Sequence, residues 1–302
     1  MRVRTSDGVG VVFDDVTLPA SVARADLPVV LLHGLSQQRH YWSPVMSRMS
    51  GIRVIAIDQR CHGDASVDED GRDVSVDTDV SMTRLATDVV EVLDACGVDQ
   101  AIVVGHSWGA SVALRAAALF PLRVRAAALI DGGLFGPRHL LAELGDQEAA
   151  REALRPPPLG MLAPVLWEAI STGDLSPYWG QEVQAALEPT FRTDSAGRVF
   201  TRIGMDRHMS VLDAMFDYDP AEDIAAVGCP VWAVVCEPPT IPDERDPDRL
   251  TAVWAAARAS AIAELPAPFF VQRWYRALHD VPLQWPALVA GLVQTIAERT
   301  RA

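Results

Sequence analysis

The chain has 302 residues, of which 49% are hydrophobic, so it can form one large α/β domain or a core domain with an insertion. Its formal charge of −14 at pH 7 argues against nucleic acid and anionic membrane surfaces as partners, and more weakly against polyanionic substrates. All 26 basic residues are arginine, and a chain without lysine cannot carry out Schiff-base chemistry, bind pyridoxal phosphate covalently or form a P-loop.

The first part of the chain, residues 1–133, alternates short apolar runs with helical patterns. This alternation is typical of a mostly parallel sheet that is covered by helices on both faces. The expected strands are residues 8–13 (an edge strand or hairpin), 28–32, 54–57, 101–104 and 124–130. The expected helices are residues 83–96, ended by Gly97, and residues 110–120.

The strand pattern stops for about eighty residues and then returns. Residues 134–218 show broken helical segments, which is too long a stretch for a plain loop in a compact domain, so we predict an inserted helical cap. Strands are expected again at residues 229–236 and 269–275, with helices at 250–258 and 283–298. The predicted organisation is a core domain of residues 1–133 and 219–302 with a cap domain of residues 134–218.

The cysteines and the N-terminus favour a cytoplasmic protein. The four cysteines lack paired or metal-type spacing, so we expect reduced and mostly buried thiols at Cys61, Cys96, Cys229 and Cys236. Residues 1–7 contain no apolar signal core, and no apolar run approaches 18 residues. We expect no membrane partner, and the sequence does not indicate an oligomeric state.

The five residues 105–109, Gly-His-Ser-Trp-Gly, have the pattern of a nucleophile elbow. They follow an expected strand and precede an expected helix, which is the context that this motif requires. Gly105 and Gly109 leave room for strand and helix to approach each other, and Ser107 would project over the end of the sheet. The sequence therefore predicts a serine nucleophile.

A serine hydroxyl needs a base within hydrogen-bond reach, and seven histidines are available. His279 follows the last expected strand, where a loop at the carboxyl edge of the sheet could reach Ser107, and it is the predicted base. The side chain of His106 would point away from the nucleophile. His40, His139 and His208 have no such placement and are interpreted as surface or structural residues.

Taken together, these pieces resemble the α/β-hydrolase fold superfamily, and within it the capped serine hydrolases of esterase and lactonase type. The matching pieces are His33-Gly34-Leu35, the segment 58–63, the elbow and His279, in the order of the family. The resemblance implies that the backbone amides of Leu35 and Trp108 form the oxyanion hole. It also implies that His33 and the segment 58–63 are mainly structural. Cys61 stands where the family usually has glycine, and we interpret it as a buried rather than a reactive thiol.

The acid that orients the base has two candidates. The family often places it in a G-x-x-D turn after the strand that follows the cap, but here this stretch reads Cys236-Glu237-Pro238-Pro239. Some capped relatives, haloalkane dehalogenases among them, carry it after the strand that follows the elbow helix, where Asp131 stands. We favour Asp131 and keep Glu237 as the alternative; Asp131 could also merely cap the start of the insertion.

The resemblance implies a serine hydrolase that cleaves a carboxylic ester or lactone of a small, moderately apolar substrate without a metal or organic cofactor. Dehalogenases and epoxide hydrolases of this fold use aspartate at the elbow, so Ser107 argues against both. Thioester, amide and carbon-carbon bond hydrolysis and perhydrolysis remain open, because all can use the same three residues. The alternatives from other classes are a ligand-binding receptor or regulatory protein and a non-hydrolytic biosynthetic enzyme.

Overall fold

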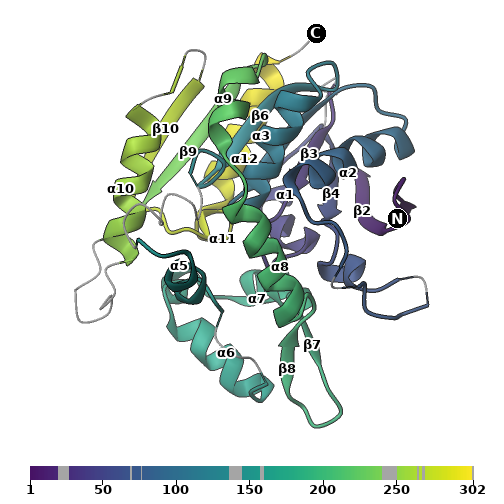
Figure 1. Ribbon diagram of the computed structural model, residues 1–302, viewed down its shortest axis with the longest axis vertical. Helices are drawn as coiled ribbons and strands as arrows, with labels where there is room; N and C mark the ends of the chain where they lie inside the picture. Colours follow the sequence, from purple (N-terminus) through teal and green to yellow (C-terminus); the bar gives the residue numbers. More distant parts are fainter. Residues whose placement is uncertain are drawn as a thin grey trace.

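The structure is a computed structural model that describes residues 1–19, 27–68, 70–75, 77–135, 145–156, 160–239, 250–263, 265–266 and 269–300. Eight of its described strands form a mixed central sheet (Figure 1), in the spatial order β1-β2-β4-β3-β5-β6-β9-β10. The strands are β1 (Arg2–Arg4), β2 (Gly10–Thr17), β3 (Val29–Leu32), β4 (Arg53–Asp58), β5 (Ala101–His106), β6 (Val124–Ile130), β9 (Val231–Glu237) and β10 (Phe269–Tyr275).

The sheet is parallel from β4 to β10 and antiparallel only at one edge. There β2 pairs antiparallel with both β1 and β4. The predicted edge hairpin is therefore present, and so is the mostly parallel arrangement that the alternating pattern indicated.

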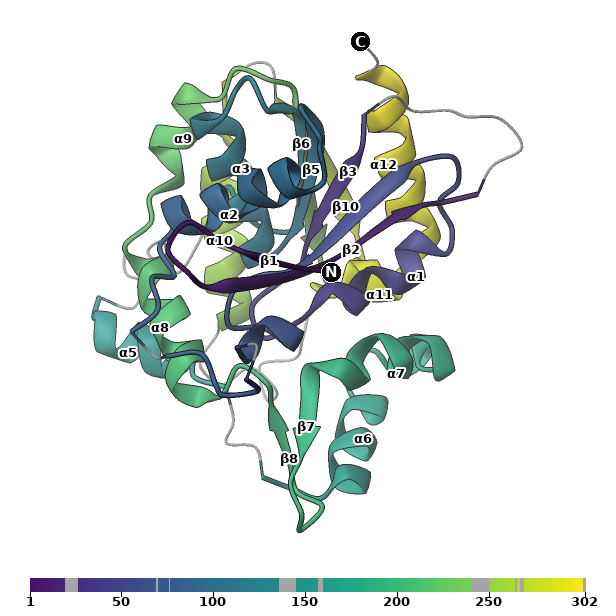
Figure 2. The same ribbon diagram turned by 90° about the vertical axis from the view of Figure 1, so that its right-hand side faces the viewer.

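Helices cover both faces of the sheet (Figure 2). One face carries α2 (Met82–Ala95), α3 (Trp108–Leu119), α9 (Pro220–Ala226) and α10 (Leu250–Ala263). The other carries α1 (Ser43–Met46), α11 (Val281–Gln284) and α12 (Pro286–Arg299). Short 3-10 helices stand at η1 (Arg39–Trp42) and η2 (Gly63–Ser66).

Strand β3 shows why its run of four apolar residues is fully buried. Side chains alternate across a strand, so Val30 and Leu32 pack in the core under α2 and α3, while Val29 and Leu31 pack in the opposite core with α12. Because both faces of the sheet are covered, the strand has no polar face to present to water, which accounts for its uninterrupted apolar sequence.

The stretch between β6 and β9 contributes no strand to the central sheet among its described residues. It forms α5 (Gln147–Ala153), α6 (Ala163–Thr172), η3 (Ser176–Tyr178), α7 (Gln181–Leu187), η4 (Glu188–Thr190), β7 (Phe191–Thr193), β8 (Val199–Thr201) and α8 (Met205–Phe216). Below, this stretch up to α8 is called the insertion; it lies beyond one end of the sheet (Figure 2).

The stretch predicted as a helical cap also contains an antiparallel hairpin, formed by β7 and β8. The turn that joins them is residues 194–197, Asp-Ser-Ala-Gly, in which Asp194 accepts hydrogen bonds from the amides of Ala196 and Arg198. Asp and Gly are typical turn residues, but the strands on either side have only three residues each, too few to show an alternating pattern.

No helix within the described ranges is long and apolar enough to cross a membrane. The four cysteines are free thiols, and Cys61, Cys229 and Cys236 are buried.

Candidate active site

Ser107 occupies the sharp turn between β5 and α3. Its backbone has φ 53° and ψ −121°, a conformation that is strained for a residue with a side chain. A Cβ atom at Gly105 would lie 2.0 Å from the carbonyl oxygen of Gly109, and one at Gly109 would lie 2.5 Å from that of Leu32. The two glycines are therefore required for the close approach of strand and helix that projects the Ser107 side chain.

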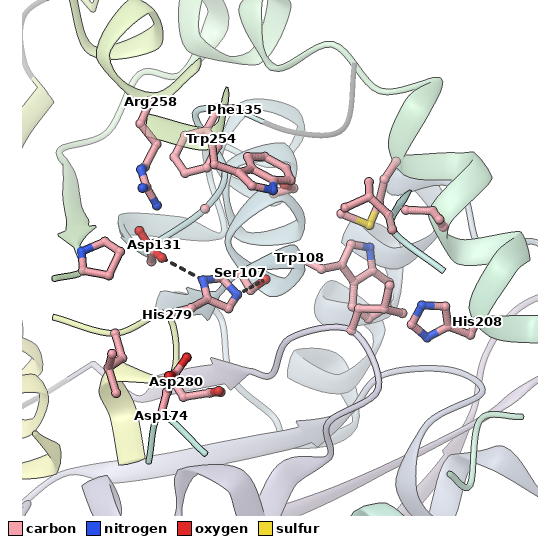
Figure 3. A pocket seen from close by; sticks show the side chains of 18 of the residues that line it. Ser107, Trp108, Asp131, Phe135, Asp174, His208, Trp254, Arg258, His279 and Asp280 are labelled. Carbon is pink, nitrogen blue, oxygen red and sulfur yellow. Dashed lines mark hydrogen bonds and ion pairs between the residues drawn. The ribbon is translucent and has the colours of Figure 1, made fainter. Parts of the chain in front are cut away.

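A chain of hydrogen bonds joins Ser107, His279 and Asp131 (Figure 3). The Ser107 Oγ lies 2.9 Å from His279 Nε2, and His279 Nδ1 lies 2.7 Å from Asp131 Oδ2. An ionised carboxylate can only accept, so Nδ1–H donates to Asp131 and Nε2 is left to accept the Ser107 hydroxyl proton. This is the arrangement in which an imidazole can act as a base toward a serine.

Asp131 reaches this chain because the backbone passes very close to the elbow. Asp131 itself has φ 48°, and a Cβ at the following Gly132 would lie 2.2 Å from the carbonyl oxygen of Ser107. The second carboxylate oxygen of Asp131 accepts the backbone N–H of Cys236 at 2.9 Å. Both oxygens of this buried group therefore have a donor.

The alternative acid, Glu237, lies elsewhere. It ends β9, and its carboxylate pairs at 3.0 Å with Arg273 on the neighbouring strand β10. Pro238 stands next to it and lines the cavity described below. Among the described residues, the structure thus brings Asp131 to His279 and directs Glu237 to an arginine.

The electrostatic setting of His279 favours its charged form. Protein atoms packed around the ring lower its pKa, but the hydrogen bond and the charge of Asp131 outweigh this effect, so the pKa of His279 is raised above its usual value of 6.5. The side chain is nevertheless 56% exposed, because one side of the ring faces the open cavity. A protonated His279 ring is therefore stabilised on the side that faces the cavity.

His106 and Tyr41 support the loop that carries His279. The His106 Nε2–H donates to the backbone carbonyl of His279 at 2.8 Å, and its ring stacks on Tyr41 at 5.2 Å between centroids. Burial lowers the pKa of His106 to about 4, so it is neutral at pH 7. The Tyr41 hydroxyl donates to Asp280 at 2.9 Å. The side chain of His106 thus points away from Ser107, as the sequence indicated.

Leu35 and Trp108 both line the cavity beside Ser107. Trp108 is the first residue of α3, and the N–H groups in the first turn of a helix have no acceptor within the helix. The loop of Leu35 runs against the elbow, since a Cβ at Gly34 would lie 3.2 Å from the Cβ of Ser107. Both backbone segments thus lie beside the Ser107 side chain.

The remaining family-like residues are packed away from the cavity. Asp58 is fully buried and accepts the backbone N–H groups of Arg39 and Asp64. His33 donates to the carbonyl of Gly34 and accepts from the amide of Gln59, and burial lowers its pKa to about 4. These contacts give the residues a structural role at the end of β4.

Cys61 belongs to the same structural segment. It is buried with φ 68°, the backbone region that favours glycine, and burial raises its pKa to about 11. A thiol with a raised pKa is a poor nucleophile at neutral pH, which agrees with its interpretation as a structural residue.

A cavity of about 490 Å³ opens over Ser107, between the carboxyl ends of the strands and the insertion. Its wall is largely apolar, with Leu35, Phe135, Leu175, Leu212, Met215 and Trp254 among the lining residues. Met215 faces the cavity, while Met209 packs in a small core of the insertion with Leu212 and Phe216. Met215 thus lines the cavity, whereas Met209 belongs to the core of the insertion.

Sequence reasoning missed several polar residues in the wall, among them Arg258 and His208. His208, on α8, is hydrogen-bonded to the Ser36 side chain at 2.7 Å. Neither residue belongs to a motif, and only the position of α8 and α10 in space brings them to the cavity. His139 lies outside the described residues.

Comparisons with known proteins agree with this architecture. A family model for the alpha/beta hydrolase fold matches residues 28–157. Epoxide hydrolase B of Mycobacterium tuberculosis is 42% identical over 97 residues, which are 32% of this chain and 26% of that protein, so the chain matches about a quarter of that relative's length.

Two solved structures share the fold over nearly their whole length. E-2-(acetamidomethylene)succinate hydrolase superposes with a TM-score of 0.71 at 20% identity, covering 98% of this chain and 97% of that one. Est816, described as an N-acyl homoserine lactone degrading enzyme, superposes with a TM-score of 0.62 at 19% identity, covering 98% and 99%. At this level of identity the likeness concerns the fold alone.

Proposed function

From the α/β-hydrolase fold of this chain, we propose that it is a serine hydrolase that cleaves a carboxylic ester or lactone of a small substrate. The observation that carries the proposal is the hydrogen-bonded chain from Ser107 through His279 to Asp131 at the floor of an apolar cavity. Several relatives are named as hydrolases, and the ester or lactone bond is the part that this proposal adds.

The proposed reaction has two halves. Ser107 attacks the carbonyl carbon while His279 Nε2 takes its proton, and the backbone amides of Leu35 and Trp108 bind the oxyanion of the tetrahedral intermediate. The intermediate collapses as His279 returns the proton to the leaving alcohol, which leaves an acyl-enzyme on Ser107. Water then attacks the acyl carbon while His279 takes its proton; the bond to Ser107 breaks, His279 returns the proton to the Ser107 oxygen, and the carboxylic acid product leaves. Asp131 holds the imidazole in the required tautomer throughout.

The nucleophile itself argues for an acyl substrate over an epoxide. A serine that opened an epoxide would form an ether, and water does not cleave an ether under mild conditions. A serine that attacks an ester forms a new ester, which the same base can hydrolyse. The likeness to epoxide hydrolase B therefore supports the fold and the hydrolase class, while Ser107 favours the carboxylic ester or lactone.

The test is the hydrolysis of short and medium-chain 4-nitrophenyl esters and of matched lactones by the wild type and three variants. We expect a burst followed by steady turnover, which Ser107→Ala abolishes. We also expect that Asp131→Asn lowers kcat by about 10³-fold or more, because the imidazole loses its orienting charge. Glu237→Gln is the matched control and should stay within about twofold of the wild type. Turnover that survives in Ser107→Ala, or a complete lack of turnover across the ester and lactone panel, would contradict the proposal.

A further inference from the structure

We propose that Arg258 binds a carboxylate group of the substrate, so that the ester cleaved here carries an anionic end as well as an apolar body. This inference rests on the proposed function and narrows its substrate class. The sequence indicated only a moderately apolar, uncharged or weakly charged substrate.

Arg258 reaches the cavity from α10. Figure 3 shows its guanidinium directed into the cavity on the same side as Trp254 and Phe135. Trp254 and Arg258 are four residues apart on α10 and therefore share a helix face. The guanidinium carbon lies 6.0 Å from the centre of the Phe135 ring, which is within cation–π range. Aromatic contacts on this side hold the charge in place.

No carboxylate among the described residues pairs with Arg258. The contrast is Arg60, which is fully buried and donates to both Asp88 and Asp7. A guanidinium in a mostly apolar cavity is unfavourable without an anion, and its planar donors fit a carboxylate with two parallel hydrogen bonds. The part of the chain that the structure describes thus presents a hydrogen-bond donor group that can bind a carboxylate.

The acids near the cavity do not take the place of such a ligand. Asp131 accepts from His279 and from the Cys236 amide, Asp280 accepts from Tyr41, and neither of these two described carboxylates forms an ion pair with Arg258. Asp174 and Asp280 lie on the opposite side of the Ser107–His279 pair from Arg258 (Figure 3). The negative end of a substrate would be repelled from that side and attracted to Arg258, so the charges also fix the direction in which the substrate lies.

The first experiment compares substrates that differ only in the terminal group. The half-esters mono(4-nitrophenyl) succinate, glutarate and adipate are matched with 4-nitrophenyl butyrate, valerate and hexanoate, and Ser107→Ala gives the background rate. Carboxyphenyl butyrate and tolyl butyrate test a carboxylate in the alcohol part. We expect kcat/KM to be about tenfold or more higher for the carboxylate member in at least one pair.

The variants show whether Arg258 binds the substrate carboxylate or supports His279 and Asp131. Arg258→Gln should lower kcat/KM for the preferred carboxylate ester about tenfold to a hundredfold and leave its neutral partner within about twofold. Arg258→Lys should restore part of the preference, and Arg258→Glu should reverse it. Arg192→Gln is the control: it removes a positive charge from the hairpin strand β7 and should leave kcat/KM unchanged for both the carboxylate ester and its neutral partner.

Two results would overturn the inference while leaving the proposed function intact. One is a wild type that hydrolyses both members of every pair equally in a Ser107-dependent way. The other is an equal loss for both members in Arg258→Gln, which would mean that Arg258 acts on His279 and Asp131 instead of on the substrate.

A binding experiment keeps the inference testable if no ester is turned over. Calorimetry with glutarate and the Ser107→Ala protein should show binding that Arg258→Gln weakens tenfold or more. Failure of all esters combined with Arg258-dependent glutarate binding would contradict the proposed function and support the carboxylate site. Lack of glutarate binding in a protein that hydrolyses neutral esters would support the proposed function and contradict the carboxylate site.

Discussion

Asp131 shows how one residue joins backbone geometry to chemistry. Its left-handed backbone and the adjacent Gly132 bring the chain against the carbonyl of Ser107, and this approach sets its carboxylate 2.7 Å from His279. The backbone of Ser107 also has a positive φ, so both residues are strained. Two residues with strained backbones at the same edge of the sheet are typical of a functional site that the rest of the fold holds in place.

The raised pKa of His279 gives the activity a defined pH dependence. His279 must be neutral to accept the serine proton, so kcat/KM should fall as the pH decreases through a pKa above 6.5. Asp131→Asn removes the hydrogen bond and charge that raise this pKa, so the acidic limb should move to lower pH. The pH profile of kcat/KM for a neutral ester measures both effects. A limb that stays in place in Asp131→Asn but moves in Glu237→Gln would assign the acid to Glu237.

Among single residues, the sequence identified those whose place in the fold follows from the order of the strands. Ser107, Asp131 and His279 each stand just after a strand, and parallel strands bring their carboxyl ends to one edge. The choice between Asp131 and Glu237 depended on side-chain direction, which spacing alone does not give. The sequence could not predict that Arg258 and His208 line the cavity, because a single residue on a helix forms no pattern that shows which cavity it faces.

At the scale of elements, the insertion contacts the loop that carries Leu35. The next residue, Ser36, has a backbone φ of 66°. Its hydroxyl forms a hydrogen bond with the ring of His208 on α8. Burial lowers the pKa of His208 to about 4, so this bond links neutral groups at pH 7. The insertion is also held to the core by Gln38, which donates to the carbonyl of Ala186 at 2.8 Å. Contacts from α8 thus help to fix the proposed oxyanion loop.

We expect Ser36→Ala to lower kcat about fivefold to tenfold with a smaller change in KM, because the Leu35 amide becomes less well positioned for the oxyanion. His208→Ala should have a similar effect, and the double variant should be no worse than the single ones, since both remove one bond. The control is Ser210→Ala, which removes an exposed hydroxyl of the same helix. Fully additive losses in the double variant would show that the bond does not position the loop.

The elements themselves differ in how well the sequence revealed them. Strands β3 to β6 and helix α2 have long apolar or amphipathic patterns and were predicted within a few residues. The hairpin β7–β8 and the short helix α11 were missed, because each has too few residues to show a period. The insertion as a whole was visible only through the interruption of the strand pattern.

On the scale of the whole molecule, several neutral histidines are buried in the core. His33 and His106 are at most 1% exposed, and burial lowers the pKa of each to about 4. In the unfolded chain they take up protons near pH 6.5, so between these values the unfolded state binds more protons and stability falls as the pH decreases. His279 and the buried Asp58 act in the opposite direction, because their pKa values are raised in the folded state.

We expect the free energy of unfolding to be lower at pH 5.0 than at pH 7.5. The two histidines together account for a loss on the order of 4 kcal/mol, which the opposing groups reduce. Urea unfolding at the two pH values measures the difference, and a comparison of pH 7.5 with pH 8.5 is the control, because His33 and His106 do not titrate there. Equal or greater stability at pH 5.0 would show that these histidines do not control the acid limit.

The most direct test of the central claim is to trap the acyl-enzyme. The protein is mixed with an excess of a 4-nitrophenyl ester, quenched in acid within the burst phase and examined by mass spectrometry. The account predicts an added acyl mass on the peptide that contains Ser107, with no such mass in Ser107→Ala. An ester that is turned over without any adduct on Ser107, or with the adduct on another residue, would contradict it.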